Sequence, residues 1–442
     1  MLIQFGVGNF RSFRDQSILS LVSANRNARE TEINRNNTFE VSNKLTLLKS
    51  AALYGANASG KSNLVSAIAY MRHFVVSSAG DSQTGLQTGV EPFRLSTETE
   101  GKPSFFEIIF IAGGTQYRYG FELDYVHVVS EWLFSVPATK EATLFTREEQ
   151  NISVSPKYFK EGKGLEKKTR SNALFLSVSA QFNGEISSKI LAWFQQLVVI
   201  SGLEDQFYRV FTIKQLMGGQ FKNDIVQLVK NLDMEIAEVE GRKLENVQFQ
   251  IPGNVPDEFR ALLLKGVQGQ EFLTVRTKHP KWNEKGEQVG LVEFDMDMNE
   301  SHGTQKAFYL AGPVLDVLQR GAVLVIDEME ARLHPLVTKE LISLFNSEKH
   351  NPHHAQLILT THDTNLLSNK VFRRDQIWFV EKDRQSASHL YSLAEIKVNN
   401  NLIRNDASYE DDYLKGRYGA VPFLGNIEQI VIDGESRNAR KK

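Results

Sequence analysis

A glycine-rich loop between an apolar run and an amphipathic segment constrains this chain most. Residues 55–62 read Gly-Ala-Asn-Ala-Ser-Gly-Lys-Ser, a full match to the phosphate-loop pattern G-x-x-x-x-G-K-[ST]. The loop follows the apolar run 47–54 and precedes residues 63–76, whose apolar side chains recur at helical spacing. A loop between a strand and a helix can point its backbone N–H groups at phosphates, and the positive end of the helix adds to the attraction. The motif therefore predicts a nucleotide-binding site.

The side chains of this loop have separate expected roles. Gly55 and Gly60 allow the backbone to curl, and Lys61 is expected to reach the β- and γ-phosphates. The hydroxyl of Ser62 is expected to ligate magnesium, so that ATP and Mg²⁺ are the expected ligands. The other expected nucleotide-binding positions are Ala56, Asn57, Ala58, Ser59 and Asn63.

Two further apolar runs end in polar residues. Residues 323–328 read Val-Leu-Val-Ile-Asp-Glu, which predicts a buried strand ending at Asp327, a magnesium ligand, and Glu328, a general base for the attacking water. Many strands end in acids, so this interpretation depends on the phosphate loop. A second strand over 357–361 ends at His362, which is expected to donate to the γ-phosphate and thereby to sense it. The alternative is a histidine that only caps the strand.

A Ser-x-Gly turn precedes a helix expected to begin near Lys306. Backbone amides at such a turn can bind an anion, which makes Ser301 and Gly303 candidate nucleotide contacts. By itself the pattern is that of a helix N-cap. Its position shortly before the Asp-Glu strand favours the anion site.

Taken in order, these four elements resemble the ABC-type ATPase head of the SMC and RecF-like proteins. The resemblance is closest to the bacterial AAA family ATPases of the RloA and AbiLi type, which are related to the OLD ATPases and linked to phage defence. It implies an α/β fold, an ABC-type P-loop ATPase head with a mixed sheet and flanking helices. The stretches that carry the resemblance are 9–13, 51–62, 172–177, 300–306, 327–335, 360–363 and 413–422.

The resemblance also implies partners and further site residues. In that family the Ser-x-Gly signature of one subunit closes on the γ-phosphate held by another, so an ATP-dependent dimer or higher oligomer is expected. Arg11 is expected near the phosphates, and residues 330–335 are expected to form the D-loop at the dimer interface. A glutamine that contacts magnesium is expected as well, but Gln83 and Gln87 lie in a loop-like segment and neither can be assigned.

The chain is expected to divide into three parts. Residues 1–179 would form an N-terminal lobe with the phosphate loop and a β-rich region, and 296–442 a C-terminal lobe with the signature, Walker B strand, D-loop and switch histidine. SMC-type proteins fill the interval with a coiled coil, but this sequence has no sustained heptads, and without cysteine it has no thiolate zinc hook. Residues 180–295 are therefore expected to form a compact helical and hairpin arm that contacts a partner. Residues 24–42 predict an exposed loop and 77–90 a mobile surface loop.

Charge and hydropathy narrow the function classes. Lys and Arg number 51 against 53 Asp and Glu, so the whole chain lacks the basic excess typical of nucleic-acid binders. No apolar run approaches the roughly 18 residues that a spanning helix needs. Arg11 and Arg14 interrupt the apolar stretch that a signal peptide would continue. A cytoplasmic protein without a membrane partner is expected.

The expected function is an ATP-hydrolysing dimer switch that controls a separately encoded nuclease or toxin in phage defence. A DNA repair or maintenance ATPase that binds DNA directly, as RecF-like proteins do, is the alternative; a transporter subunit fits the signature less well. The basic residues of 437–442 could touch nucleic acid, although a frayed terminus is the commoner explanation. Nuclease activity is not expected, because 430–435 only faintly resembles the start of a TOPRIM domain. Asp295 and Asp297 are interpreted as the solvent face of a half-buried strand.

Overall fold

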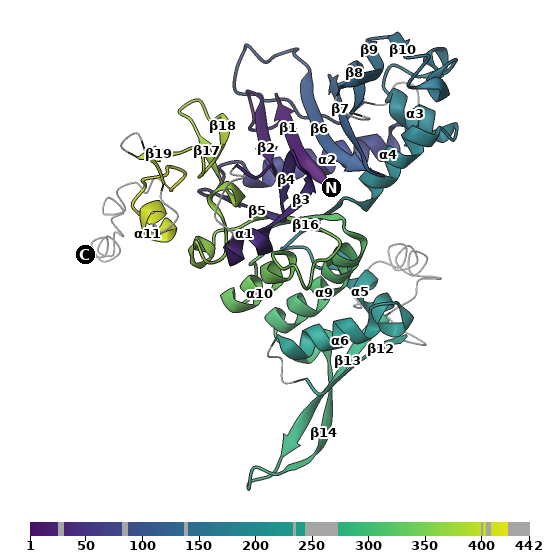
Figure 1. The fold of residues 1–442 in the computed structure, drawn as a ribbon. Helices are drawn as coiled ribbons and strands as arrows, with labels where there is room; N and C mark the ends of the chain where they lie inside the picture. Colours follow the sequence, from purple (N-terminus) through teal and green to yellow (C-terminus); the bar gives the residue numbers. More distant parts are fainter. Residues whose placement is uncertain are drawn as a thin grey trace, which may run out of the picture.

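Two β-sheets and the helices around them form the body of the molecule (Figure 1). The computed structural model describes residues 1–24, 31–81, 87–136, 140–232, 236–243, 273–398, 401–403 and 408–422. Within these residues, no helix combines the length and the apolar character needed to span a bilayer. The stretches 430–435 and 437–442 lie outside the described residues.

The central sheet carries the phosphate loop. Its strand order is β11 (Val198–Ser201), β15 (Val323–Asp327), β16 (Gln356–Thr360), β5 (Ser50–Tyr54), β17 (Ile377–Lys382) and β18 (Ser388–Ser392). All neighbouring pairs are parallel except β17–β18, which is antiparallel, so the sheet is mixed as expected. Because parallel strands end at the same edge, the residues that follow β5, β15 and β16 gather there.

Both faces of this sheet are buried, which explains its continuous apolar runs. On β15, Val323 and Val325 face one core, and Leu324 and Ile326 face the other. Helix α2 (Lys61–Asp81) packs on the first face, and α3 (Phe175–Gln181) and α4 (Glu185–Gln196) contribute to the same core. Helices α9 (His302–Arg320) and α10 (Pro335–Phe345) pack on the second face, and α5 (Gln206–Gly218), α6 (Lys222–Asn231) and α11 (Tyr409–Leu414) contribute to its core.

The second sheet is antiparallel, and α2 packs between the two sheets (Figure 1). Its order is β10 (Asn151–Val154), β9 (Ala142–Glu148), β8 (Val128–Val136), β7 (Thr115–Leu123), β6 (Ser104–Ala112), β1 (Leu2–Gly8) and β2 (Ser17–Ser20). Gly113 and Gly114, both with positive φ, join β6 to β7 in the expected hairpin.

The interval expected to form an arm contains elements of two kinds. Helix α4 packs against β6 and α2, and β11 pairs with β15 in the central sheet. Helices α5 and α6 instead pack on α9, beside a small sheet of β12 (Glu238–Lys243), β13 (Leu273–Trp282) and β14 (Gln288–Asp295). The β13–β14 hairpin projects from the body (Figure 1). The division into three domains stays a prediction.

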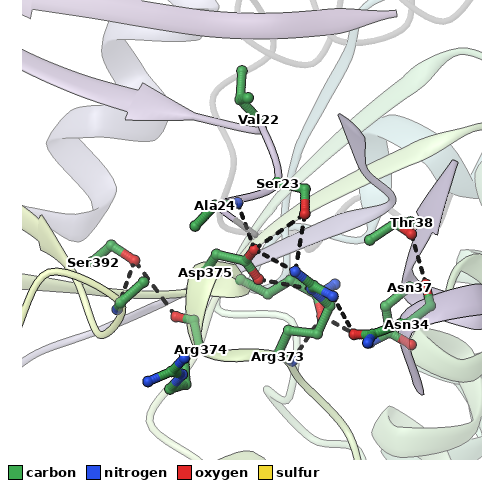
Figure 2. A network of polar contacts seen from close by, with 12 residues as sticks. Val22, Ser23, Ala24, Asn34, Asn37, Thr38, Arg373, Arg374, Asp375 and Ser392 are labelled. Carbon is green, nitrogen blue, oxygen red and sulfur yellow. Dashed lines mark hydrogen bonds and ion pairs between the residues drawn. The ribbon is translucent and has the colours of Figure 1, made fainter. Parts of the chain in front are cut away.

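The expected loop over residues 24–42 is wrong for its described part. Residues 32–42 form α1 (Glu32–Asn37) and β3 (Thr38–Ser42), which pairs with β4 (Leu45–Leu48). Distant polar groups hold this segment: Asn37 donates to Gln376 Oε1 at 2.7 Å, and Asp375 accepts from the Ala24 amide at 2.9 Å. Figure 2 shows this network, in which Arg373 also donates to Ser23. The polar side chains that predicted a loop therefore act as tertiary contacts.

Two other local predictions are corrected. Helix α2 continues to Asp81, so the first five residues of the surface loop predicted over 77–90 are helical, and Val90 at the end of that range is buried. Residues 82–86 lie outside the described part. Asp297 does not lie on a strand with Asp295: Asp295 caps the short helix α8 (Met296–Asn299), and Asp297 in that helix pairs with Arg209.

The remaining short elements lie around these layers. They are β19 (Lys397–Val398) and β20 (Asn401–Leu402), with the 3₁₀ helices η1 (Lys160–Gly162), η2 (Glu166–Lys168), η3 (Thr364–Leu366) and η4 (Arg374–Gln376). The stretch 413–422 packs beside the phosphate-loop strand. Tyr413 stacks on Phe379, with ring centroids 5.5 Å apart, and lies 6.2 Å from the ring of Tyr54.

Candidate nucleotide-binding site

The phosphate loop connects β5 to α2 in a conformation that its glycines make accessible. A Cβ at Gly55 would overlap the carbonyl oxygen of Val380 on the neighbouring strand. Gly60 has a φ of +117°, and a Cβ there would overlap the Ser388 hydroxyl. Both positions therefore require glycine because the backbone passes too close to β17 and β18. Asn57 and Ala58 are exposed at the top of the loop.

Lys61 is buried in the first turn of α2 and folds back over the loop. Its ammonium donates to the carbonyl oxygens of Gly55 at 2.9 Å and Ala56 at 3.1 Å. Burial lowers the pKa of Lys61, while the nearby carboxylates of Asp327 and Glu328 oppose the shift. The ammonium thus lies within electrostatic range of both acids. The hydroxyl of Ser62, the next residue, is exposed.

Two serines that the sequence interpretation did not single out brace the loop. The Ser388 hydroxyl donates to the carbonyl oxygen of Ser59 at 2.6 Å, and its oxygen lies 2.8 Å from the hydroxyl oxygen of Ser12. Ser12 in turn accepts from the Asn63 amide at 2.7 Å. The only sequence signal for Ser12 was its place in the stretch 9–13. Ser388 carried no signal, since its role depends on strand pairing.

Arg11 lies one residue from this brace but points to a different partner. Its Nε pairs with Glu91 at 3.3 Å, and both side chains are exposed. Its φ of +49° lies in the left-handed region, and its backbone N–H donates to the Glu91 carbonyl at 2.7 Å. Neither of these interactions involves the phosphate loop, so the role of Arg11 as a phosphate ligand stays a prediction.

Thr360 connects the acids at the end of β15 to the end of β16. Its hydroxyl donates to Asp327 Oδ1 at 2.6 Å and accepts from the Glu328 amide at 2.7 Å. Glu328 has a φ of +50°, which turns the chain sharply after the strand. One hydroxyl therefore fixes both the carboxylate of Asp327 and the backbone of Glu328.

His362 follows the same strand and contacts a third acid. Its backbone N–H donates to Glu330 Oε1 at 2.6 Å, while Glu330 Oε2 is buried without a hydrogen-bond partner in the described residues. Burial lowers the pKa of His362, and the ammonium of Lys61 lowers it further, against the opposing effect of Glu330. The imidazole is therefore neutral at neutral pH. Its interaction with Lys61 places it on the phosphate-loop side of the edge.

Ser301 is the N-cap of α9, which begins at His302, four residues before the expected start. The Ser301 hydroxyl accepts from the Thr304 amide at 3.1 Å, and Ser301 and His302 are exposed. A Cβ at Gly303 would lie 3.0 Å from the carbonyl oxygen of Arg332. The signature turn and the segment 330–335 thus adjoin within one chain.

The oxygen groups at this edge fit magnesium. Asp327 supplies a carboxylate and Ser62 a hydroxyl, both of the hard-oxygen type that the ion prefers. Among the described residues, no cluster of three or more His, Asp or Glu side chains could hold a metal by itself. Magnesium usually keeps several waters and binds through one or two protein groups together with phosphates, so a sparse donor set is expected.

A family model and two solved structures are similar to this chain. A family model described as "AAA domain, putative AbiEii toxin, Type IV TA system" matches residues 50–368. The SMC head domain from Thermotoga maritima is similar over 90% of this chain and 99% of its own, with 14% identity and a TM-score of 0.40. An Smc head bound to the C-winged helix domain of ScpA has 14% identity over 88% and 97%, with a TM-score of 0.39. A search of curated proteins found no match.

Proposed function

From the premise that this chain belongs to the AAA domain family of the putative AbiEii toxin type, we propose that it binds ATP with magnesium and hydrolyses it. Its fold is that of an ABC-type P-loop ATPase head. The observation that carries the proposal is the meeting of Lys61, Asp327 and His362 at one edge of the central sheet, in mutual electrostatic range.

The residues at this edge have separate roles in phosphoryl transfer to water. The backbone N–H groups of the loop and the Lys61 ammonium bind the β- and γ-phosphates. Ser62 and Asp327 would hold magnesium, which would supply positive charge to neutralise the phosphates. Glu328 accepts a proton from the attacking water as its oxygen bonds to the γ-phosphorus and the bond to the β,γ-bridging oxygen breaks. Neutral His362 donates a hydrogen bond to the γ-phosphate.

Phosphate release by the purified chain tests this proposal. We expect Mg²⁺-dependent release from ATP, and loss of ATP binding in Lys61→Ala, because its charge-assisted hydrogen bonds contribute about 1.5–3 kcal/mol each. Lys339→Ala makes the same change at an exposed position of α10 and is expected to behave as wild type. An unchanged ATP affinity in Lys61→Ala would show that the phosphate loop does not bind ATP.

We further propose that ATP closes two copies head to head, with Ser301 and Gly303 of each on the nucleotide of the other. Exposed apolar side chains on segments bonded to the signature helix support this arrangement. Leu203, Phe207 and Met298 are 53%, 81% and 82% exposed, and the segments that carry them are bonded to α9 through Asp205 and Asp297. A second copy that docks at the signature would cover exposed apolar side chains of this kind.

The dimer is proposed to control a separately encoded nuclease or toxin in phage defence, within the RloA and AbiLi group. The toxin–antitoxin wording of the family description supports this role. Affinity purification of the Glu328→Gln variant from its native host tests it. We expect a nuclease-like or toxin-like protein that is retained with ATP and lost with Lys61→Ala. Nucleic acid without a protein partner would instead indicate direct DNA maintenance.

A further inference from the structure

Lys306 is a lysine of the signature helix that has no exposed surface. It is the fifth residue of α9 and lies five residues after the signature serine, and its side chain is 0% exposed. Its ammonium donates to the hydroxyl of Tyr208 at 2.7 Å, to Asp205 Oδ1 at 3.0 Å, and to the carbonyl oxygen of Gly202. A buried ammonium is costly unless its protons are all bonded, and these three acceptors bond all three.

One of these acceptors belongs to a residue packed against the catalytic turn. The Gly202 N–H donates to the Asp327 carbonyl oxygen at 2.6 Å, and a Cβ at Gly202 would overlap the Glu328 carbonyl oxygen. Gly202 therefore accepts a hydrogen bond from Lys306 through its carbonyl oxygen and donates one to the end of β15 through its N–H. A single residue separates the ammonium from the backbone of Asp327 and Glu328.

The same ammonium is linked to the D-loop. Asp205 accepts from Lys306 through Oδ1 and pairs through Oδ2 with Arg332 at 3.4 Å. Arg332 has a φ of +65°, and its carbonyl oxygen faces Gly303 of the signature. The start of α9, the D-loop and the end of β15 therefore meet around Lys306. A shift of the first turn of α9 has to move these contacts together.

We propose that Lys306 is a positioning residue that couples the signature of each chain to Glu328 of the same chain. When the signature engages the nucleotide of the other copy, the first turn of α9 moves, and Lys306 transmits that movement through Gly202 to the turn that holds Glu328. Hydrolysis at one nucleotide then depends on ATP at the other. The inference rests on the proposed ATP-dependent dimer and adds the route by which its two sites communicate.

Steady-state hydrolysis of Lys306→Met tests the coupling, since Met keeps the length of the side chain without its charge. We expect ATP affinity close to wild type but a kcat lower by about tenfold or more, because small displacements of catalytic groups have effects of that size. With two coupled sites, the Hill coefficient for ATP in the wild type should lie between one and its limit of about two. In Lys306→Met it should fall to about one. Lys306→Arg should restore part of the cooperativity, and Lys339→Met should match wild type.

Several outcomes would overturn the coupling. A lower kcat with an unchanged Hill coefficient would make Lys306 a structural residue only. If the wild-type protein dimerises with ATP but hydrolyses it without cooperativity, the proposed coupling is wrong and the proposed dimer still stands. If Glu328→Gln binds ATP but does not dimerise, both the proposed dimer and the proposed coupling are wrong. If Lys306→Met does not fold, Tyr208→Phe takes its place in the test, because it removes one of the three acceptors of the Lys306 ammonium. The coupling then requires that Tyr208→Phe lower the Hill coefficient without changing ATP affinity.

Discussion

The hydroxyl of Thr360 organises the chemistry of the site at the scale of single residues. It holds the carboxylate of Asp327 from one side and the amide of Glu328 from the other. Both bonds arise because β15 and β16 run parallel with Ile326 opposite Leu359, which sets Asp327 beside Thr360. The position of the expected magnesium ligand therefore depends on a side chain of the neighbouring strand.

Removal of this hydroxyl is expected to slow hydrolysis. Thr360→Val keeps the shape of the side chain but leaves the Asp327 carboxylate and the Glu328 amide without their bonds, at about 1–3 kcal/mol for each group. We expect kcat to fall by about ten- to a hundredfold, measured as phosphate release. Thr338→Val is the matched control, since Thr338 is buried and its hydroxyl has no partner among the described residues. Equal rates in the two variants would contradict the role of Thr360.

His362 is expected to titrate below its usual pKa of 6.5, since burial and Lys61 both disfavour its charged form. As the pH falls through 6.5, the unfolded chain takes up the proton before the folded chain does. The free energy of unfolding should therefore decrease below that pH, and this part of the decrease should be absent in His362→Gln. The imidazole resonance that His362→Gln removes should have a midpoint below 6.5. A midpoint above 6.5 would show that the folded state favours the charged ring.

The sequence predicted the acids, the phosphate loop and the histidine because each has a local signature. It did not predict Ser388 or the role of Thr360, because both depend on which strands are neighbours and in which register. Local spacing carries no information on that pairing. Lys306 was recognised only as the place where a helix begins, since its partners lie about 100 residues away.

At the scale of elements, a buried ion pair anchors the helix that contains the stretch 172–177. Glu131 on β8 accepts from the backbone amides of Phe175 and Leu176, at 2.6 and 3.0 Å, and so caps α3. Its carboxylate also lies 3.7 Å from the Arg147 guanidinium on β9, and both side chains are fully buried. Side-chain bonds thus attach α3 to the antiparallel sheet, much as the network of Figure 2 attaches α1 and β3 to the segment before β17.

Loss of the Glu131 carboxylate is expected to destabilise this lobe strongly. Glu131→Ala leaves the Arg147 charge buried and two helix amides unbonded, so we expect the free energy of unfolding to fall by about 3–5 kcal/mol. Chemical denaturation measures this change. Glu141→Ala provides the comparison, because its pair with Arg118 is partly exposed and should contribute about 1 kcal/mol or less. A similar small loss in both variants would show that the buried pair is not an anchor.

At the scale of the whole molecule, the exposed apolar side chains on the segments bonded to the signature helix should matter only when two copies meet. Phe207→Ser is expected to leave ATP binding unchanged and to weaken the ATP-dependent dimer by about tenfold or more, since burial of a Phe side chain contributes about 1.5–3 kcal/mol. Trp282→Ser is the control, because Trp282 is also well exposed but is the last residue of β13, which belongs to the projecting hairpin. Sedimentation velocity with ATP compares them. A stronger loss in Trp282→Ser would move the contact to the hairpin.

In the proposed cycle, ATP brings two copies together, and hydrolysis with Glu328 as the general base separates them again. The most direct test is the mass of the Glu328→Gln variant in solution with Mg²⁺ and either ATP or ADP, measured by light scattering with bound nucleotide quantified. We expect a monomer with ADP and a dimer with ATP that retains two unhydrolysed ATP molecules. A variant that is saturated with ATP but stays monomeric, or one that is a dimer with ADP as well as with ATP, would contradict the proposed cycle.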